Sequence, residues 1–423
     1  MAATSTEVSY GRDQADALRA AVARIVAETP VTDIHTHLYA PPFGELLLFG
    51  IEELLTYHYL VAEVFRVSNV PYDAFWAMPK AAQADLVWKE LFLERSPISE
   101  ACRGVLTALD RLGLDTASRN LAGYRAWFRD RDPNAHVNEV FARANISSAV
   151  MTNDPFDDLE RPVWESAYAG DPRFHAALRI DPLLNAWPAA NRRLSHFGYD
   201  VGGSIDTPTI NGVRKFLDDR ILRMKALYMA VSLPPDFAFP EDSARAKLLE
   251  HAVLPAARDH NIPFALMVGV TRQVNPALRL AGDGVGYTSL APLHHLCAHF
   301  PDNKFMTTYL ARENQHELCV AARKFRNLLV FGCWWFLNNP SLIDEMTRMR
   351  IEMLGLSVVP QHSDARVLEQ VIYKWDHART VIADVLADKF TDLVRTGWTV
   401  TEDEIRRDAA TLLGGAFWDF ARR

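Results

Sequence analysis

The sequence predicts an α/β fold, a closed (β/α)8 barrel of the TIM type with a helical insertion after its first strand. Eight short apolar segments with strand character recur along the chain, and helical segments separate them. Such near-continuous apolar runs are typical of parallel strands that are buried on both faces. Eight of them favour a closed barrel. A doubly wound open sheet is the alternative, but no glycine fingerprint follows the first strand.

The expected strands can be taken in chain order. The first spans residues 31–37 and ends in a His-Thr-His motif. The other seven are expected at 147–152, 174–179, 226–233, 263–268, 303–308, 328–331 and 357–360. Helices are expected at 13–26 before the first strand, and between later strands at 211–224, 242–259, 292–300, 314–325 and 341–354. This alternation predicts one barrel over residues 1–423.

Residues 40–146 do not follow this alternation. Their segments favour helices, and strands are hard to find among them. An insertion of about 105 residues is too long for a plain loop between a strand and a helix. We therefore expect a helical cap between strands one and two, placed over the carboxyl end of the barrel.

Composition and charge exclude several classes of partner. The chain of 423 residues has a formal net charge of −8 and no block of Lys or Arg, so no nucleic-acid partner is expected. No stretch reaches the ~18 apolar residues of a membrane span, and the first 29 residues contain no apolar run of signal-peptide type. Four scattered cysteines without CxxC spacing favour reduced thiols. The expected location is the cytoplasm.

Three residues at the strand ends predict a metal site. His35 and His37 are two residues apart on a strand, so both imidazoles point to the same side. Asp364 follows strand eight, which lies beside strand one in a barrel. Two imidazoles and one carboxylate leave positions open for water or substrate, as in catalytic zinc sites. We expect one divalent metal ion, and Zn²⁺ is the expected identity. The alternative for His-x-His alone is one buried ring and one incidental ring.

Arginines also follow the strand ends. Arg179, Arg312 and Arg366 come after three different strands in a chain of negative net charge. The guanidinium group suits bidentate recognition of carboxylates, so this set indicates an anionic, oxygen-rich small molecule. The alternative is that each arginine caps a helix or pairs with a nearby acid such as Asp181 or Glu313.

The pattern of His-x-His after strand one and Asp after strand eight resembles the amidohydrolase superfamily. Its hydrolases usually add His after strands five and six, and often Lys or Glu after strand four, all of which this chain lacks. These departures resemble the uronate isomerase family of that superfamily. The matching stretches, in the family's order from about residue 30 to the end, are 31–37, 53–63, 151–156, 179–182, 312–317 and 361–366.

The resemblance implies interconversion of D-glucuronate with D-fructuronate and of D-galacturonate with D-tagaturonate. It implies that the metal on His35, His37 and Asp364 binds the uronate carboxylate and the C5 hydroxyl, whose proton Asp364 takes. Further implied roles are Tyr59 as the acid–base group at the carbonyl oxygen, Arg366 as the stabiliser of the enediolate, and His58, Arg179, Arg312 and Arg423 as sugar-binding residues. The alternative for Tyr59 is packing of the cap, since three consecutive residues, 57–59, cannot share one helix face.

Two other functions remain open from the residues. One is a mononuclear metal-dependent hydrolase or decarboxylase of a small carboxylate. The other is a sugar-acid binding protein without activity, against which the set of His35, His37, Asp364 and Tyr59 argues. The aromatic segment 417–423 is expected to dock on the barrel or on a neighbouring subunit, and we expect a homo-oligomer.

Overall fold

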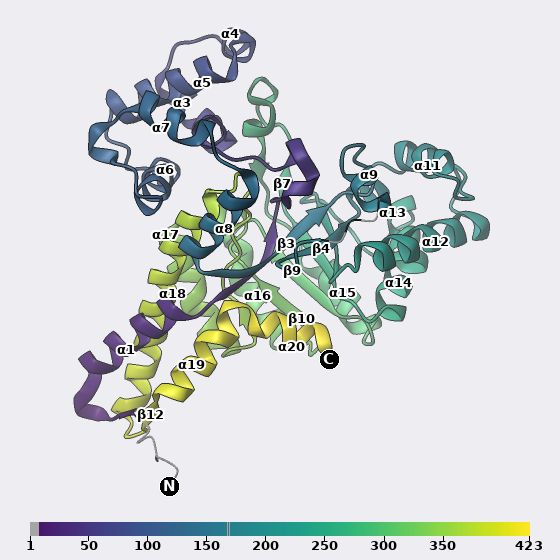
Figure 1. Ribbon diagram of the computed structural model, residues 1–423. Coiled ribbons are helices and arrows are strands. Elements are labelled where there is room, and N and C mark those ends of the chain that lie inside the picture. The colour runs from purple at the N-terminus through teal and green to yellow at the C-terminus, as the bar shows by residue number, and fades with distance from the viewer. Residues whose placement is uncertain (1–7, 167, 169) are drawn as a thin grey trace.

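One parallel sheet of eight strands runs through the structure, a computed structural model that describes residues 8–166, 168 and 170–423 (Figure 1). The strands are β2 (Val31–Thr36), β3 (Ile146–Asn153), β4 (Phe174–Arg179), β5 (Met229–Leu233), β6 (Phe264–Val268), β9 (Phe305–Tyr309), β10 (Leu328–Phe331) and β11 (Val358–Val359). They lie side by side in chain order. The predicted α/β class and all eight predicted strands are therefore confirmed.

The edge strands β2 and β11 share no ladder, but the segment after β11 reaches β2 at the carboxyl end of the sheet. There Asp364 N donates to His35 O (3.2 Å), and His37 N donates to Ala365 O (2.8 Å). These two backbone hydrogen bonds join the segment after β11 to the end of β2. They curl the sheet closed at the end where the active sites of such barrels lie.

The opposite end of the barrel is filled by the C-terminal segment. The turn Thr411–Gly415 lies against β2, and Gly414 has a φ of +132°. A Cβ atom at this position would lie 2.7 Å from Cβ of Thr32, so only glycine fits. In α20 (Ala416–Arg422), the buried ring of Phe417 lies 6.1 Å from that of Tyr228 inside the barrel. The aromatic end of the chain thus plugs the base, which leaves the carboxyl end as the mouth.

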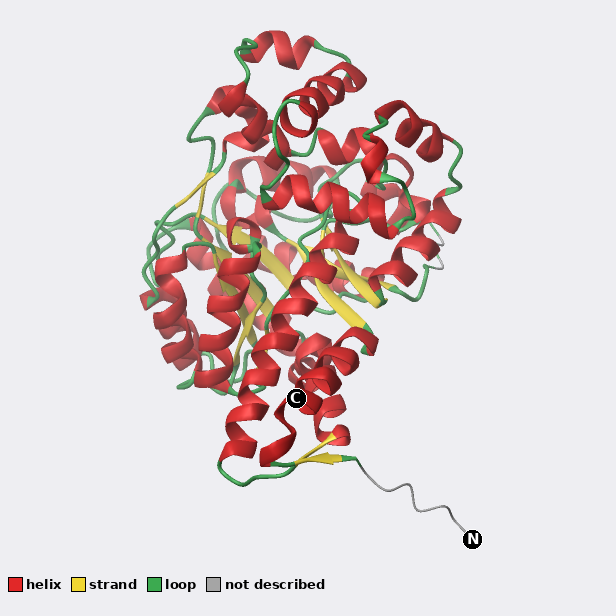
Figure 2. Cartoon of the chain, turned by 90° about the vertical axis from the view of Figure 1, so that its left-hand side faces the viewer, coloured by secondary structure: helices red, strands yellow, loops and turns green. Residues whose placement is uncertain are grey.

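Helices surround the sheet, as Figure 2 shows. Outside the insertion they are α1 (Ala15–Glu28), α9 (Glu160–Glu165), α10 (Asp181–Asn185), α11 (Trp187–His196), α12 (Thr207–Met224), α13 (Ala244–Leu248), α14 (Leu254–Asp259), α15 (Ala291–His299), α16 (Gln315–Ala322), α17 (Pro340–Leu354), α18 (Gln370–Arg395) and α19 (Glu402–Ala410). None of the helices in the described ranges is both long enough and apolar enough to cross a membrane.

Between β2 and β3 the chain is helical. The segments are α2 (Ile51–Leu55), α3 (His58–Val67), α4 (Tyr72–Ala77), α5 (Lys80–Trp88), α6 (Glu100–Arg111), α7 (Leu121–Arg129) and α8 (Pro133–Ala144). In Figure 1, α3, α4, α5 and α7 gather at the upper left, beyond the ends of the strands. Two short pairs complete the structure, β1 (Ser9–Tyr10) with β12 (Val400–Thr401) and β7 (Val270–Thr271) with β8 (Gly284–Val285).

Capping residues set the ends of the covering helices. α8, α12 and α17 each have Pro in the first turn. Their N-cap residues are Asp132, Asp206 and Asn339, and the side chain of each accepts a hydrogen bond from a backbone N–H of the first turn. They end at residues with positive φ, namely Asn145, Lys225 and Gly355. These local signals explain why the predicted helix boundaries at 211–224 and 341–354 agree with α12 and α17 to within a few residues.

Candidate functional site

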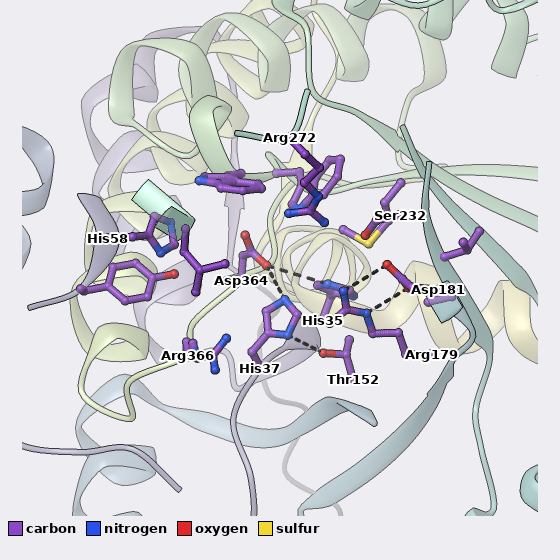
Figure 3. Close-up of a pocket in the computed structure, with 17 residues that line it drawn as sticks. His35, His37, His58, Thr152, Arg179, Asp181, Ser232, Arg272, Asp364 and Arg366 are labelled. Atoms are coloured by element: carbon purple, nitrogen blue, oxygen red, sulfur yellow. Dashed lines mark hydrogen bonds and ion pairs between the residues drawn. The ribbon is translucent and has the colours of Figure 1, made fainter. Parts of the chain in front are cut away.

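Three predicted metal ligands come together at the mouth of the barrel (Figure 3). His35 and His37 stand at the end of β2, and Asp364 follows β11. Their ligand atoms all lie within 4.8 Å of one another. The Nε2 atoms of His35 and His37 are 3.9 and 3.4 Å from Oδ1 of Asp364. His35 is 2% exposed and Asp364 is 6% exposed, whereas the side chain of His37 is 28% exposed, so the group is buried on one side and open to the cavity at His37.

Hydrogen bonds on the far side of each ring fix the histidine tautomers. Nδ1 of His35 is 3.1 Å from the hydroxyl of Tyr228, and this hydroxyl donates its own proton to the carbonyl of the residue before the histidine. Nδ1 of His37 is 2.8 Å from the hydroxyl of Thr152, which likewise donates to the carbonyl of the preceding residue. Each hydroxyl must therefore accept the Nδ1 proton, which leaves both Nε2 atoms as free lone pairs.

The donor set fits a divalent cation. Two Nε2 lone pairs face the carboxylate of Asp364, whose Oδ1 is buried and has no hydrogen-bond partner among the described residues. Burial, with the charges of His362 and His37, lowers the pKa of His35 well below its usual range, so this ring is neutral. Burial raises the pKa of Asp364, but the adjacent imidazoles of His37 and His35 lower it by more, so the carboxyl is ionised. Neutral imidazoles and an ionised carboxylate are the forms that bind metal.

The backbone near Asp364 is held in an uncommon conformation. Asp364 has a φ of +53°, which side chains other than glycine adopt rarely. The buried ring of His362 lies directly over Gly332, where an added Cβ would stand 1.6 Å from Nδ1. Gly332 itself has a φ of +65°. Close packing of this turn against β10 therefore directs the Asp364 carboxylate toward the two histidines.

A cavity of about 320 Å³ opens beside the metal group. It is lined by His35, His37, Tyr57, His58, Thr152, Arg179, Asp181, Ala230, Val231, Ser232, Met267, Arg272, Leu280, Trp334, Trp335, Asp364 and Arg366. Its size suits a small molecule, and its wall combines apolar faces with a few charged groups.

The three arginines of the cavity wall differ in whether an acidic side chain pairs with them. Arg179 is held bidentately by Asp181, at 3.0 and 3.1 Å. Arg272 pairs with Asp283 at 2.5 Å. The guanidinium of Arg366 has neither a hydrogen bond nor an ion pair with any described residue. It is therefore the arginine of this wall whose positive charge is free to bind an anion.

Other predicted residues lie in different places. His58 and Arg179 line the cavity, whereas Tyr59 does not, and Tyr57 lines it instead. The hydroxyl of Tyr59 is buried without a hydrogen-bond partner among the described residues, and its ring lies 5.0 Å from that of Tyr57. Burial, followed by nearby acidic groups, raises the pKa of both tyrosines well above the usual value.

The structure does not bring Arg312 and Arg423 to the cavity. Arg312 is exposed and pairs with Glu345 at 3.0 Å. Arg423 lies with Leu328 and Ser357, at the amino ends of β10 and β11, on the plugged side of the barrel. The sugar-binding roles predicted for these two arginines have no support in this arrangement of one chain.

Sequence reasoning missed four residues of the site. Arg272 directly follows β7, the short strand after β6, so reading it as a strand-end arginine would have found it. Thr152 is a polar residue near the end of β3 and was open to the same reasoning. Tyr57 and Tyr228 gave no such signal, because one precedes a helix of the insertion and the other precedes the amino end of β5.

Comparisons with known proteins agree with this architecture. Neither models of known families nor curated proteins gave a match. Among solved structures, the chain is similar to a uronate isomerase from Bacillus halodurans C-125, at 56% identity and a TM-score of 0.95, covering 97% of each chain. A uronate isomerase from Thermotoga maritima is 16% identical with a TM-score of 0.78, covering 96% of this chain and 98% of that one. A glucuronate isomerase from Caulobacter crescentus is 17% identical with a TM-score of 0.74, covering 99% and 97%.

Proposed function

The chain belongs to the uronate isomerase family, and we propose that it interconverts D-glucuronate with D-fructuronate and D-galacturonate with D-tagaturonate. The observation that carries this proposal is the 56% identity to a uronate isomerase over 97% of the chain. The cavity supports it, since a free arginine and a metal-binding group share one wall. A hydrolase or decarboxylase is not favoured. Among the described residues that line the cavity, His58 is the one histidine besides His35 and His37, and it comes from the insertion and not from strand five or six.

The substrate's carboxylate and hydroxyl groups define what the site must bind. A divalent metal on His35, His37 and Asp364, zinc in our proposal, would supply positive charge to the uronate carboxylate and the adjacent C5 hydroxyl. Asp364 would accept the proton of that hydroxyl. Arg366 would stabilise the negative charge of the enediolate, because its guanidinium is not neutralised by an acid of the chain. His58 and Arg179 would orient the sugar.

Isomerisation also needs a group that exchanges a proton with the carbonyl oxygen. We propose Tyr59 for this role, as the sequence predicts, and its unpartnered buried hydroxyl supports the assignment. Tyr57 competes with it, because Tyr57 lines the cavity. The two Phe variants decide between them. We expect Tyr59→Phe to lower kcat by about 10²-fold and Tyr57→Phe to keep most turnover; the reverse result would move the role to Tyr57.

We propose that residues 40–146 act as a cap over the site. Trp76 of α4 donates through Nε1 to the carbonyl of Ala277 (2.8 Å), and Arg279 lies over the Trp76 ring at 4.4 Å. These contacts connect the insertion to the segment between β7 and β8, which contributes Leu280 to the cavity wall. Such a cover would keep water from the enediolate during proton transfer.

Further parts of the proposal concern the setting of the enzyme. We propose a cytoplasmic protein, which its four free and buried cysteines support. We also propose a homo-oligomer. Size-exclusion chromatography coupled to light scattering measures its mass, and a mass of 47.7 kDa, that of one chain, would contradict self-association.

Proton NMR in deuterated water tests the reaction itself. The metal-loaded protein is incubated with D-glucuronate or D-galacturonate, and we expect the 2-keto sugar acid with an unchanged carbon skeleton. Deuterium at C1 of the product would indicate an exchangeable proton on the transfer path. Absence of product from both sugars would overturn the proposed function.

A further inference from the structure

A buried lysine lies behind the proposed acid–base tyrosine. Lys374 of α18 is 2% exposed, and its Nζ has no hydrogen-bond partner among the described residues. Burying an ammonium group without a partner costs several kcal/mol in general, so stability alone does not favour lysine here. A methionine or leucine of similar volume would avoid this desolvation.

The ammonium group faces aromatic rings. Nζ of Lys374 lies 5.3 Å from the ring centre of Tyr59 and 5.8 Å from that of Tyr373. Both distances are within the range of a cation–π contact. Tyr59 belongs to α3, the helix that begins at His58 on the cavity wall, whereas Lys374 belongs to the helix after the Asp364 turn. The contact therefore joins the insertion to the barrel directly behind the site.

Lys374 keeps its charge near neutral pH. Burial lowers the pKa of its ammonium to about 8, against the attraction of the carboxylates of Asp364, Glu100 and Asp33. By contrast, the groups around Tyr59 raise its pKa, since burial, Tyr57 and Asp364 all disfavour a negative oxygen there. The positive charge of Lys374 lies against the ring of Tyr59, and a cation in that place favours negative charge on the phenol oxygen.

We propose that Lys374 is a positioning residue that holds the ring of Tyr59 and stabilises the negative charge its hydroxyl gains during proton transfer. This inference rests on the proposed function, because Lys374 acts through Tyr59. Its effect on the rate arises in the transition state, where the phenol oxygen carries more charge than in the substrate complex. Loss of the ammonium should therefore lower kcat and leave KM for the uronate almost unchanged.

A double-mutant cycle tests this inference on the metal-loaded enzyme. We expect Lys374→Met to lower kcat by about tenfold, because the phenol oxygen loses a nearby positive charge in the transition state, and Lys374→Arg to restore most of that loss. In the Tyr59→Phe background, Lys374→Met should lower kcat no further. Lys304→Met is the matched control. Its half-buried ammonium donates to the carbonyl of Ala421 (2.6 Å) at the base of the barrel, so kcat should not change.

The outcomes separate this inference from the proposed function. Normal kcat in Lys374→Met, or an effect that adds fully to that of Tyr59→Phe, would overturn the inference while Tyr59 keeps its role. Full turnover in Tyr59→Phe would remove Tyr59 from the mechanism and the inference with it. If Lys374→Met fails to fold, Lys374→Gln takes its place in the same cycle, and thermal unfolding of each variant shows that kcat refers to folded protein.

Discussion

Two buried groups of histidine and carboxylate share the chain segment after β11, and their atoms are paired differently. Nε2 of His136 lies 2.6 Å from Oε1 of Glu369, and both side chains are fully buried. The same oxygen accepts the backbone N–H of Gly50 at 3.0 Å. In the metal group, by contrast, bare imidazole nitrogens stand 3.4 and 3.9 Å from the Asp364 carboxylate. The first group is joined by direct hydrogen bonds, and the second brings lone pairs together.

This difference separates a structural role from a functional one. Glu369 connects α8 and the start of α2 to the barrel, so it secures the insertion. In the metal group, two imidazole nitrogens and a carboxylate oxygen face one another without a hydrogen bond as short as that of the first group, an arrangement that suits a bound cation. Residue types alone do not distinguish the two groups. The arrangement of donors and acceptors does.

The largest effect should come from breaking the structural group. We expect Glu369→Ala to lower the free energy of unfolding by about 3–5 kcal/mol, because it leaves His136 and the Gly50 N–H buried without an acceptor. Urea unfolding followed by circular dichroism measures this loss. The metal content of the folded variant should remain that of the unaltered protein. A change in metal content without a loss of stability would assign Glu369 to the site instead.

Breaking the metal group should reverse this pattern. We expect Asp364→Asn to lower kcat/KM by about 10²-fold or more and to reduce the bound metal, because the carboxylate supplies the negative ligand. The unfolding free energy of the metal-free protein should fall by less than in Glu369→Ala, since Oδ1 has no hydrogen-bond partner among the described residues and only longer contacts with the two imidazoles. Steady-state kinetics with metal analysis of the same sample checks both. Full activity with a full complement of metal would exclude Asp364 as a ligand.

A smaller effect should follow when a ligand loses its support. Thr152→Val removes the hydroxyl that accepts the Nδ1 proton of His37, so we expect metal affinity to fall about tenfold. Competition with a chelator of known affinity measures the shift. Thr308→Val is the control, because the buried Oγ1 of Thr308 has no hydrogen-bond partner among the described residues. Equal affinities in the two variants would show that this hydrogen bond does not orient the ligand.

The eight strands and the convergence of the three candidate metal ligands could be predicted from sequence for one physical reason. Parallel strands that are buried on both faces give apolar runs, and the barrel places the ends of all of them at one mouth. The residues that follow each apolar segment can therefore be expected to line the cavity, without any knowledge of the packing. The same reasoning covered Arg179, Arg366 and, in principle, Arg272.

The insertion and the C-terminus were beyond that reasoning. α2 ends at Leu55 and α3 begins at His58, while Tyr57 between them has extended backbone angles of φ −64° and ψ 144°. Helical periodicity therefore does not fix which tyrosine faces the cavity. The position of Arg423 depends on where the last helix docks, and the sequence pattern left open whether it docks on its own barrel.

A third buried carboxylate, that of Asp33, should make the stability of the protein depend on pH. Asp33 of β2 accepts hydrogen bonds from Ser363 N (3.0 Å) and from Nε1 of Trp375 (2.8 Å). All of its partners are neutral, so burial outweighs them and raises its pKa from 3.8 to about 6. Since the folded pKa lies above the unfolded one, the proton stabilises the fold. This contribution is complete below pH 3.8 and is lost as the pH rises through about 6.

The smallest predicted effect is therefore a pH dependence of stability. As the pH rises from 5 to 7 and Asp33 loses its proton, we expect the unfolding free energy of the metal-free protein to fall by about 1 kcal/mol through this residue. Asp33→Asn changes stability at every pH through its altered hydrogen bonds, but it has no proton to lose. The difference between the two proteins should therefore shift by that amount, as urea unfolding at both pH values would measure. A constant difference would mean that the Asp33 carboxylate is ionised throughout, and that neutral donors alone can stabilise a buried charge beside this site.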